Sequence, residues 1–399
     1  MEWKEVRLGD VADVQTGPFG SQLHKDNYVN KGTPIVTVEH LGNKWFTSQN
    51  LPMVSDEDKL RLAKYCSQEG DVIFSRVGSV DRCSYVSKEY SGWLFSGRCL
   101  RVRPRSGINP EYLYYFLTNE GTKQYIRNIA VGATMPSINT KLLNEVPVKI
   151  PSLPDQCRIA SILSSLDRKI ELNNKSNADL EEMAQAIFKN WFVDFEPFKD
   201  GKFVDSELGM IPEGWKVGTL EDIAEITMGQ SPAGNSLNEN REGMIFYQGS
   251  SDFGFRFPSI RVFTTEPKRL AVANSVLFSV RAPVGDINVA KEECCIGRGV
   301  ASIKSKYGHD SYLFYTMKSL HKLFDSFDGE GTVFGSINKK TLSAIQILLP
   351  SDGIVEQFNN IASSFDDRIR SLSDENSRLS LLRDTLLPRL MSGELEVPE

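Results

Sequence analysis

Residues 155–191 of the chain read DQCRIASILSSLDRKIELNNKSNADLEEMAQAIFKNW. From Ile159 to Trp191, apolar or amide side chains recur at alternating intervals of four and three residues, without a break. An average interval of 3.5 residues is the heptad pattern of a coiled coil. The stretch therefore predicts a helix of about 40 residues, which is roughly 60 Å long at 1.5 Å per residue.

The same spacing returns between Phe358 and Leu390, where Arg383 interrupts the otherwise apolar seam. Two long helices with matching seams are expected to pack on each other. The alternative is that each helix lies alone on its own domain. Asn177 and Asn376 occupy the same seam position in the two copies, and we interpret them as residues that fix the register.

The two helices belong to a larger internal duplication. Ser137-Ile138-Asn139 matches Ser336-Ile337-Asn338 at an offset of 199 residues, and Trp3 matches Trp215 at an offset of 212. Before each helix lie short β-branched and aromatic runs broken by turn residues, which indicates a compact α+β domain. Strands are expected at 35–38, 72–74 and 146–150, and buried helices at 112–117 and 312–315. The expected division is a first domain at 1–151, a long helix in 152–199, a connection at 200–211, a second domain at 212–350 and a long helix in 351–399.

Composition narrows the functional classes. The net charge is −6, but residues 1–151 carry +3 and residues 212–350 are neutral, so the acidity lies in the two helical regions. No apolar run is long enough for a transmembrane helix, and the first residues do not form a signal peptide, so we expect a cytoplasmic protein. Six cysteines and four histidines show no metal-ligand spacing, and no metal is expected.

Motifs for catalysis are missing from the sequence. There is no phosphate-binding loop ending in Lys-Ser or Lys-Thr, no nucleophile elbow and no dinucleotide-binding glycine pattern. The tetrapeptide that adenine methyltransferases place at a flipped base is also missing. Acidic pairs such as Asp366-Asp367 and Glu292-Glu293 are interpreted as solvated surface. The chain is expected to bind rather than to react. The rival interpretation is a fused nuclease or methyltransferase with degenerate motifs.

Loops rich in Gly, Ser, Asn, Lys and Arg are suited to contact with a polyanion, because they combine donors with close backbone approach. They are residues 17–25, 75–82 and 132–141 in the first half and 229–235, 279–285 and 332–340 in the second. The candidate binding residues are Ser21, Gln22, Lys25, Arg76, Ser79, Arg82, Thr134, Asn139, Lys141, Ser231, Asn235, Arg281, Asn338 and Lys340.

Each candidate also has a structural interpretation. Ordinary turn chemistry explains the first two loops equally well, and Asn139 and Asn338 can be helix N-caps. A run of arginines at 98, 101, 103 and 105 adds a basic strand, in which the last three share one face. For that run the alternative is an exposed strand face with no ligand.

The order of motifs resembles the specificity subunits of type I restriction–modification enzymes. The resemblance covers essentially the whole chain. It rests on the segments Asp155-Gln156-x-x-Ile159-Ala160, Trp191-Phe192-Val193-Asp194-Phe195-Glu196-Pro197, Leu208-Gly209-Met210-Ile211-Pro212-Glu213-Gly214-Trp215 and Leu386-Leu387-Pro388-x-Leu390-Met391-Ser392-Gly393. The second helix departs from the first, because Glu356-Gln357 falls two residues later than Asp155-Gln156.

The resemblance implies a DNA-reading scaffold with no chemistry of its own. Two target-recognition domains would each read one half of a split, asymmetric site, and an antiparallel coiled coil would set the spacer between the halves. The implied partners are double-stranded DNA, two modification subunits and motor-nuclease subunits, with no membrane. S-adenosylmethionine, ATP and Mg would belong to the partners, and this chain would carry no cofactor. The alternative is an orphan or phase-variable specificity module outside an active restriction complex.

Overall fold

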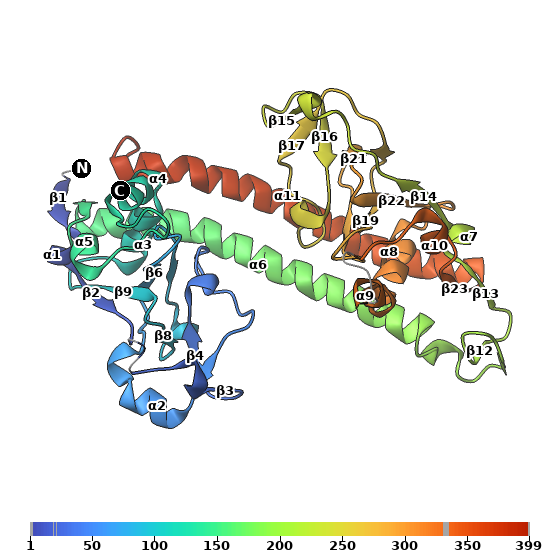
Figure 1. Ribbon diagram of the computed structural model, residues 1–399, viewed down its shortest axis with the longest axis horizontal. Helices are drawn as coiled ribbons and strands as arrows, with labels where there is room; N and C mark the ends of the chain where they lie inside the picture. Colours follow the sequence, from blue (N-terminus) through green and yellow to red (C-terminus); the bar gives the residue numbers. More distant parts are fainter. Residues whose placement is uncertain (1–2, 19, 21, 330–334, 398–399) are drawn as a thin grey trace. The chain divides into compact units, whose positions relative to one another are not determined.

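The computed structural model describes residues 3–18, 20, 22–329 and 335–397 (Figure 1). It divides into two compact units, Met1–Asn173 with Asp374–Glu399, and Asn174–Ser373. Each unit contains one α+β domain and a part of each of two long helices, α6 (Leu153–Phe192) and α11 (Asp352–Ser392). The α+β class and the two long helices are as predicted.

The domain of the first unit is built on two small sheets. One has the strand order β2-β9-β6-β7 and is antiparallel throughout, and the other has the order β3-β5-β4-β8. The first and last strands of the domain in the sequence, β1 and β10, form a separate antiparallel pair. The elements are β1 (Lys4–Arg7), α1 (Leu8–Val11), β2 (Ala12–Thr16), β3 (Tyr28–Val29), β4 (Thr33–Val36), β5 (Met53–Val54), α2 (Asp56–Arg61), β6 (Val72–Ser75), β7 (Cys83–Tyr85), β8 (Leu94–Phe95), β9 (Cys99–Pro104), α3 (Pro110–Thr118), α4 (Glu120–Ile129), α5 (Thr140–Asn144) and β10 (Pro147–Ile150).

The domain of the second unit repeats this plan. Its antiparallel sheet has the order β14-β22-β19-β20, the second sheet has the order β15-β17-β16-β21-β18, and β13 pairs with β23. A short pair, β11 with β12, lies in the connection between the halves. The elements are β11 (Phe203–Val204), β12 (Ile211–Pro212), β13 (Lys216–Thr219), α7 (Leu220–Ile223), β14 (Ala224–Met228), β15 (Leu237–Asn238), β16 (Met244–Tyr247), β17 (Val262–Thr264), β18 (Leu270–Ala271), β19 (Val276–Ser279), β20 (Ile287–Val289), β21 (Cys294–Ile296), β22 (Val300–Ser305), α8 (Asp310–Ser319), α9 (His321–Gly329), α10 (Lys339–Ser343) and β23 (Gln346–Leu349).

The predicted short elements are confirmed with small changes at their ends. The strand expected at 35–38 ends at Val36, because residues 38–40 form a 3-10 turn. The helix expected at 112–117 is α3, which begins after the cap Asn109, whose side chain accepts from the Tyr112 amide. The long helix α6 stops at Phe192, shortly before Phe195 takes a left-handed backbone conformation.

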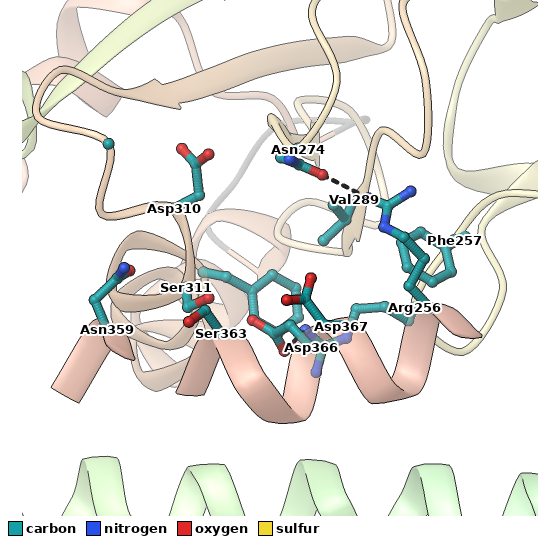
Figure 2. Close-up of a pocket in the computed structure, with 13 residues that line it drawn as sticks. Arg256, Phe257, Asn274, Val289, Asp310, Ser311, Asn359, Ser363, Asp366 and Asp367 are labelled. Atoms are coloured by element: carbon teal, nitrogen blue, oxygen red, sulfur yellow. Dashed lines mark hydrogen bonds and ion pairs between the residues drawn. The ribbon is translucent and has the colours of Figure 1, made fainter. Parts of the chain in front are cut away.

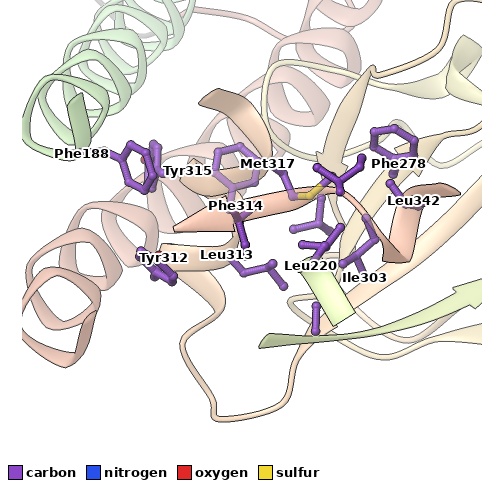
Figure 3. Close-up of a cluster of buried hydrophobic side chains, with 14 of the residues drawn as sticks. Phe188, Leu220, Phe278, Ile303, Tyr312, Leu313, Phe314, Tyr315, Met317 and Leu342 are labelled. Carbon is purple, nitrogen blue, oxygen red and sulfur yellow. The ribbon is translucent and has the colours of Figure 1, made fainter. Parts of the chain in front are cut away.

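Helices α3 and α8 form the centre of each core. All six side chains from Tyr112 to Leu117 are buried, and so are the seven from Ser311 to Met317. A helix with no exposed face in this stretch must be covered on both sides. In the second unit, Phe188 of α6 joins the same cluster as Tyr312 of α8 and Phe278 of the sheet (Figure 3). The domain and the long helix therefore share one hydrophobic core.

The long helices run antiparallel within each unit. In the first unit, Asn173 Nδ2 donates to Asn376 Oδ1 at 2.9 Å, and Arg383 pairs with Asp167, so rising residue numbers on α6 meet falling numbers on α11. In the second unit, the rings of Phe188 and Phe358 lie 5.5 Å apart. The alternative of two helices that each lie alone on a domain is therefore wrong.

The two seam asparagines are not equivalent in their contacts. Asn376 pairs with Asn173, one turn before Asn177 on α6. Asn177 is buried, and within the described part of the chain its Oδ1 has no hydrogen-bond partner. A direct hydrogen bond across the seam therefore supports the register role of Asn376. Its partner on α6 is Asn173 and not Asn177.

The basic strand does not present a polyanion-binding face. Arg101 is 7% exposed and donates to the carbonyl oxygens of Lys64 and Cys66. Arg103 forms two hydrogen bonds of 2.7 Å with Asp71, and Arg105 pairs with Asp13. Both earlier interpretations of this run, a ligand-binding face and an exposed strand face, are wrong for Arg101, because internal partners hold it inside the domain.

Gly229 lies where a side chain does not fit, because an added Cβ would stand 2.1 Å from the Gly297 carbonyl oxygen. We expect Gly229→Ala to destabilise the second domain by about 1–3 kcal/mol, as overpacking does. Gly234 in the same loop has open space around it and serves as the control for Gly234→Ala. Thermal unfolding of the full chain measures both. Equal midpoints for the two variants would contradict the crowding.

Asn139 and Asn338 cap the short helices α5 and α10, where their side chains accept from the amides of Leu142 and Thr341. We expect Asn139→Ala to cost about 0.5–2 kcal/mol of stability, because a helix N-terminal amide loses its acceptor. Asn139→Ser keeps an acceptor and should recover most of the loss. Denaturant titration of the two variants checks this, and an equal loss in both would argue against a cap.

Candidate nucleic-acid interface

Four loops of the first domain meet at one end of its antiparallel sheet. The Gly17 amide donates to the Cys99 carbonyl at 3.1 Å, which brings the loop after β2 to the turn before β9. The Arg76 amide donates to the Arg98 carbonyl at 2.8 Å, and the Ile138 amide donates to the Arg76 carbonyl at 2.9 Å. Loops that are far apart in the sequence therefore form one surface.

Gly17 allows the closest of these approaches. A Cβ at this position would stand 2.1 Å from the Ser96 carbonyl oxygen, a contact that no side chain tolerates. The glycine is therefore required for the first loop to cross the turn at residues 96–98. In the sequence it was only one of several turn glycines, and the need for it comes from the fold.

A groove of about 840 Å³ lies on this surface. Its cationic lining residues are Lys25, Arg82 and Arg98, and all three are exposed. Glu39, Ser96 and Gly97 line it as well. A groove with three cations and several hydrogen-bonding groups is chemically suited to a phosphate backbone and to base edges.

The second domain builds the same loop surface from equivalent bonds. The Gly229 amide donates to the Val300 carbonyl at 2.9 Å, and the Val280 amide to the Gly299 carbonyl at 3.0 Å. The Ile337 amide donates to the Val280 carbonyl at 3.1 Å. These bonds correspond one by one to those of Gly17, Arg76 and Ile138. The structure therefore brings the predicted loops together in both halves.

Arg76 and Arg281 do not occupy equivalent positions. Ser75 and Ser279 each donate a hydroxyl to the carbonyl two residues later, at 2.9 Å, which aligns Ser75 with Ser279. Arg76 then aligns with Val280, and Arg281 stands one place later. Arg76 is half-buried and its Nη1 donates to the Gly97 carbonyl at 3.1 Å, whereas Arg281 is exposed. Of the two, Arg281 is better placed to reach a ligand.

The remaining candidates fall into three groups. Bonded inside the protein are Gln22, which accepts from the Tyr65 hydroxyl, Ser231, which donates to Gln248, and the helix caps Asn139 and Asn338. Exposed on the loops or on the short helices next to them are Lys25, Ser79, Arg82, Thr134, Lys141, Asn235 and Lys340. Ser21 and residues 332–334 of the last loop lie outside the described residues.

Sequence reasoning missed the turn before the last long strand of each sheet. Arg98 was grouped with the basic strand, but it stands in this turn and faces the groove with Lys25 and Arg82. Arg298 occupies the corresponding turn of the second domain, and its amide donates to the Ser231 hydroxyl at 3.3 Å. The available signal was an arginine beside glycines directly before a buried strand, in both copies.

The described residues hold neither a metal-binding cluster nor a membrane-spanning helix. No group of three or more His, Cys, Asp and Glu side chains is arranged to hold a metal ion. Among the described helices, none has an apolar stretch that would reach across a lipid bilayer.

Comparison with known proteins places the chain in a family. Residues 1–182 and 212–380 match the type I restriction modification DNA specificity domain. A protein of Methanocaldococcus jannaschii, provisionally named the MjaX type I restriction enzyme specificity subunit, is 33% identical over 408 residues, which covers 99% of this chain and 94% of the relative. The HindI specificity subunit of Haemophilus influenzae is 26% identical and covers 99% of this chain and 100% of its own length.

A solved structure supports the fold independently. The crystal structure of the S subunit of a type I restriction-modification system from M. genitalium aligns with a TM-score of 0.60 at 16% identity, over 98% of this chain and 96% of that one. At this identity the likeness concerns the fold alone. The family follows from the sequence. The two matched domains cover most of the chain and one relative is 33% identical over its length, so the chain belongs to the family of type I restriction-modification DNA specificity subunits.

Proposed function

We propose that this chain is the non-catalytic subunit that reads a split, asymmetric DNA site for a type I restriction–modification complex. Each α+β domain reads one half-site with its four-loop surface. The observation that carries the proposal is that the same loop surface is built twice, by equivalent backbone bonds, with different side chains. A duplicated frame with different exposed cations is suited to two different half-sites.

The division of labour follows the sequence repeat. We assign one recognition domain to residues 1–151 and the other to residues 212–350, with spacer helices in 152–199 and 351–399 and a connection at 200–211. Net charge supports this division, because the two domains are positive or neutral while the helical regions carry the negative charge. Phosphate contacts belong to the domains, since acidic helices repel the DNA backbone.

The helices are the proposed docking surface for protein partners. In the first unit, Leu172 on α6 and Leu381 and Leu382 on α11 are exposed apolar side chains, with 61%, 69% and 47% of their surface accessible. We assign two modification subunits and the motor-nuclease subunits as partners, and we place S-adenosylmethionine, ATP and Mg on those subunits. The complex works where its DNA lies, which is the cytoplasm.

Exposed arginines on the two loop surfaces should each affect one half-site. We expect Arg82→Ala to weaken or relax recognition of one half and Arg281→Ala the other, because a lost bidentate base contact costs about 1–3 kcal/mol. The controls are Arg105→Ala and Lys306→Ala. These cations directly follow the last residues of β9 and β22, at the strand ends away from the loop surface. Methylation-site mapping of the reconstituted complex reads out both half-sites.

Two outcomes would contradict the assignment of Arg82 and Arg281 to separate half-sites, and a third would contradict the proposed function. If Arg82→Ala or Arg281→Ala changed both half-sites equally, the side chain would act on phosphates or on the fold. If the control variants relaxed a half-site to the same degree, net charge rather than loop position would be responsible. A complex with no split methylation site at all would remove the proposed function.

The helices should set the spacing and not the sequence. Removing one heptad from each long helix keeps both seams in register and shortens the pair by about 10 Å, which is roughly three base pairs. We expect both half-site sequences to survive while the preferred spacer shortens, as measured by methylation mapping on sites with graded spacers. New half-site letters at an unchanged spacer would mean that the helices themselves read DNA.

A further inference from the structure

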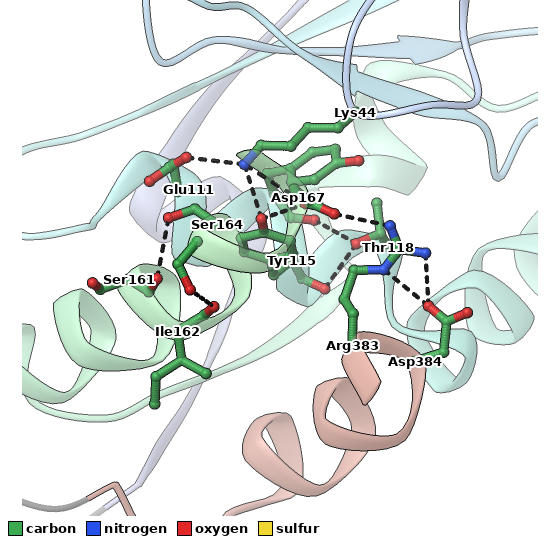
Figure 4. A network of polar contacts seen from close by, with 12 residues as sticks. Lys44, Glu111, Tyr115, Thr118, Ser161, Ile162, Ser164, Asp167, Arg383 and Asp384 are labelled. Atoms are coloured by element: carbon green, nitrogen blue, oxygen red, sulfur yellow. Dashed lines mark hydrogen bonds and ion pairs between the residues drawn. The ribbon is translucent and has the colours of Figure 1, made fainter. Parts of the chain in front are cut away.

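A buried cluster of charged side chains joins the first domain to the long helices. Lys44 is 8% exposed, and its Nζ lies 3.1 Å from Glu111 Oε1 and 3.7 Å from Asp167 Oδ2. The Tyr115 hydroxyl accepts from Lys44 at 2.8 Å and donates to Asp167 Oδ2 at 2.5 Å. Asp167 Oδ1 accepts from Arg383 at 2.8 Å (Figure 4). The cluster thus ties a loop of the domain to α3, α6 and α11.

The second unit contains a cluster of the same design. Arg256 is 3% exposed and lies 2.6 Å from Asp366 Oδ1 and 3.1 Å from Glu181 Oε2. It also donates to the Tyr315 hydroxyl at 2.9 Å, and Lys318 completes the cluster by pairing with Glu181. Figure 2 shows Asp366 on α11, beside a small polar cavity that Arg256 also lines. The interpretation of Asp366 as a solvated side chain is therefore wrong, whereas Asp367 is exposed.

The members of the two clusters correspond through the internal repeat. Asp167 and Asp366 stand 199 residues apart, which is the offset of the repeat in this region, and Tyr115 and Tyr315 stand 200 apart. Lys44 and Arg256 are also equivalent. The Lys44 carbonyl accepts from the Tyr85 amide at the end of β7 at 2.8 Å, and the Arg256 carbonyl accepts from the Val289 amide at the end of β20 at 2.9 Å. The cluster is thus a feature of the duplicated unit.

Two contributions differ in sign between the clusters. The domain helix gives the carboxylate of Glu111 in the first cluster and the cation Lys318 in the second. The facing long helix gives the cation Arg383 in the first cluster and the carboxylate of Glu181 in the second. In each case two cations face two carboxylates. Burial, and then the charge of Asp167, raise the pKa of Tyr115, so its hydroxyl stays protonated and donates. The charges are balanced and their bonds are directional.

Such a cluster is better suited to fixing a geometry than to adding stability. Buried ion pairs lose hydration, and apolar side chains of similar size often stabilise a core equally well. Hydrogen bonds between charged groups, however, are satisfied in one arrangement only. A joint held by such bonds resists rotation, while a purely apolar joint can slide.

The first cluster is also connected to the candidate groove. Thr37, Val38 and Glu39 line the groove, and so does Asn50, while Lys44 lies between them on the same segment. In the second domain, Gln248 accepts from the loop residue Ser231, and Arg256 follows on the same segment. One chain segment in each domain therefore runs from the loop surface to the joint with the helices.

We propose that Asp167 and Asp366 are positioning residues that fix the angle between each recognition domain and the helix pair, and thereby the number of base pairs allowed between the half-sites. They read no base themselves. The proposal rests on the proposed function, because it assumes that each domain reads a half-site.

The test uses the full chain and its reconstituted complex. The variants are Asp366→Asn with the control Asp367→Asn, and Asp167→Asn with the control Glu171→Gln, an exposed carboxylate on the same helix. Methylation is mapped on a library of sites whose spacers are one base pair shorter or longer than the native spacer. We expect both aspartate variants to keep the half-site letters while their relative methylation of altered spacers rises at least tenfold. The controls should match the wild type.

Hydrogen–deuterium exchange of the free chain tests the joint without DNA. Amides in residues 38–50 should exchange several-fold faster in Asp167→Asn, and those in residues 250–258 in Asp366→Asn. Tyr115→Phe and Tyr315→Phe remove one hydroxyl each, and they serve if an aspartate variant fails to fold. Unchanged spacer discrimination in folded variants with faster exchange would overturn the proposal, and so would unchanged exchange. A wild-type complex with no split site would refute the proposed function, while the exchange result would still stand.

Discussion

Burial of one helix on both sides is the constraint on which each unit depends. Helices α3 and α8 have no exposed face over Tyr112–Leu117 and Ser311–Met317, so they need a sheet on one side and a long helix on the other. The aromatic rings of Tyr312, Phe188 and Phe358 pack at this junction with centroid distances of 5.5–6.3 Å, and the two pairs that involve Phe358 meet edge to face. Neither domain can leave its helix segments without exposing this core to water.

The polar clusters add direction to this apolar joint. The hydrophobic effect has no preferred direction, whereas the hydrogen bonds around Asp167 and Asp366 require one arrangement of four elements. Arg383, which interrupts the apolar seam of the second helix, is explained by this requirement, because it neutralises Asp167 from the facing helix. The exception in the heptad pattern thus marks a contact with the first domain's joint.

Duplication preserved the backbone frame and released the side chains. The loop bonds of Gly17, Arg76 and Ile138 recur at Gly229, Val280 and Ile337, since they involve amides and carbonyls that any residue provides. The side chains on that frame differ, and Arg281 even stands one place away from Arg76. A surface with a constant frame and variable side chains can change the DNA sequence that it reads without refolding.

Periodicity and local turn chemistry were enough to predict the duplication, the α+β class, the two long helices and the loops that form the candidate interface. The sequence alone could not show that Arg101 is buried, that Arg98 faces the groove or that Asp366 is paired. Those outcomes depend on which distant segment lies opposite each side chain. A charge without a neighbour in the sequence looks solvated, but a partner such as Arg256, 110 residues away, removes it from water once the chain is folded.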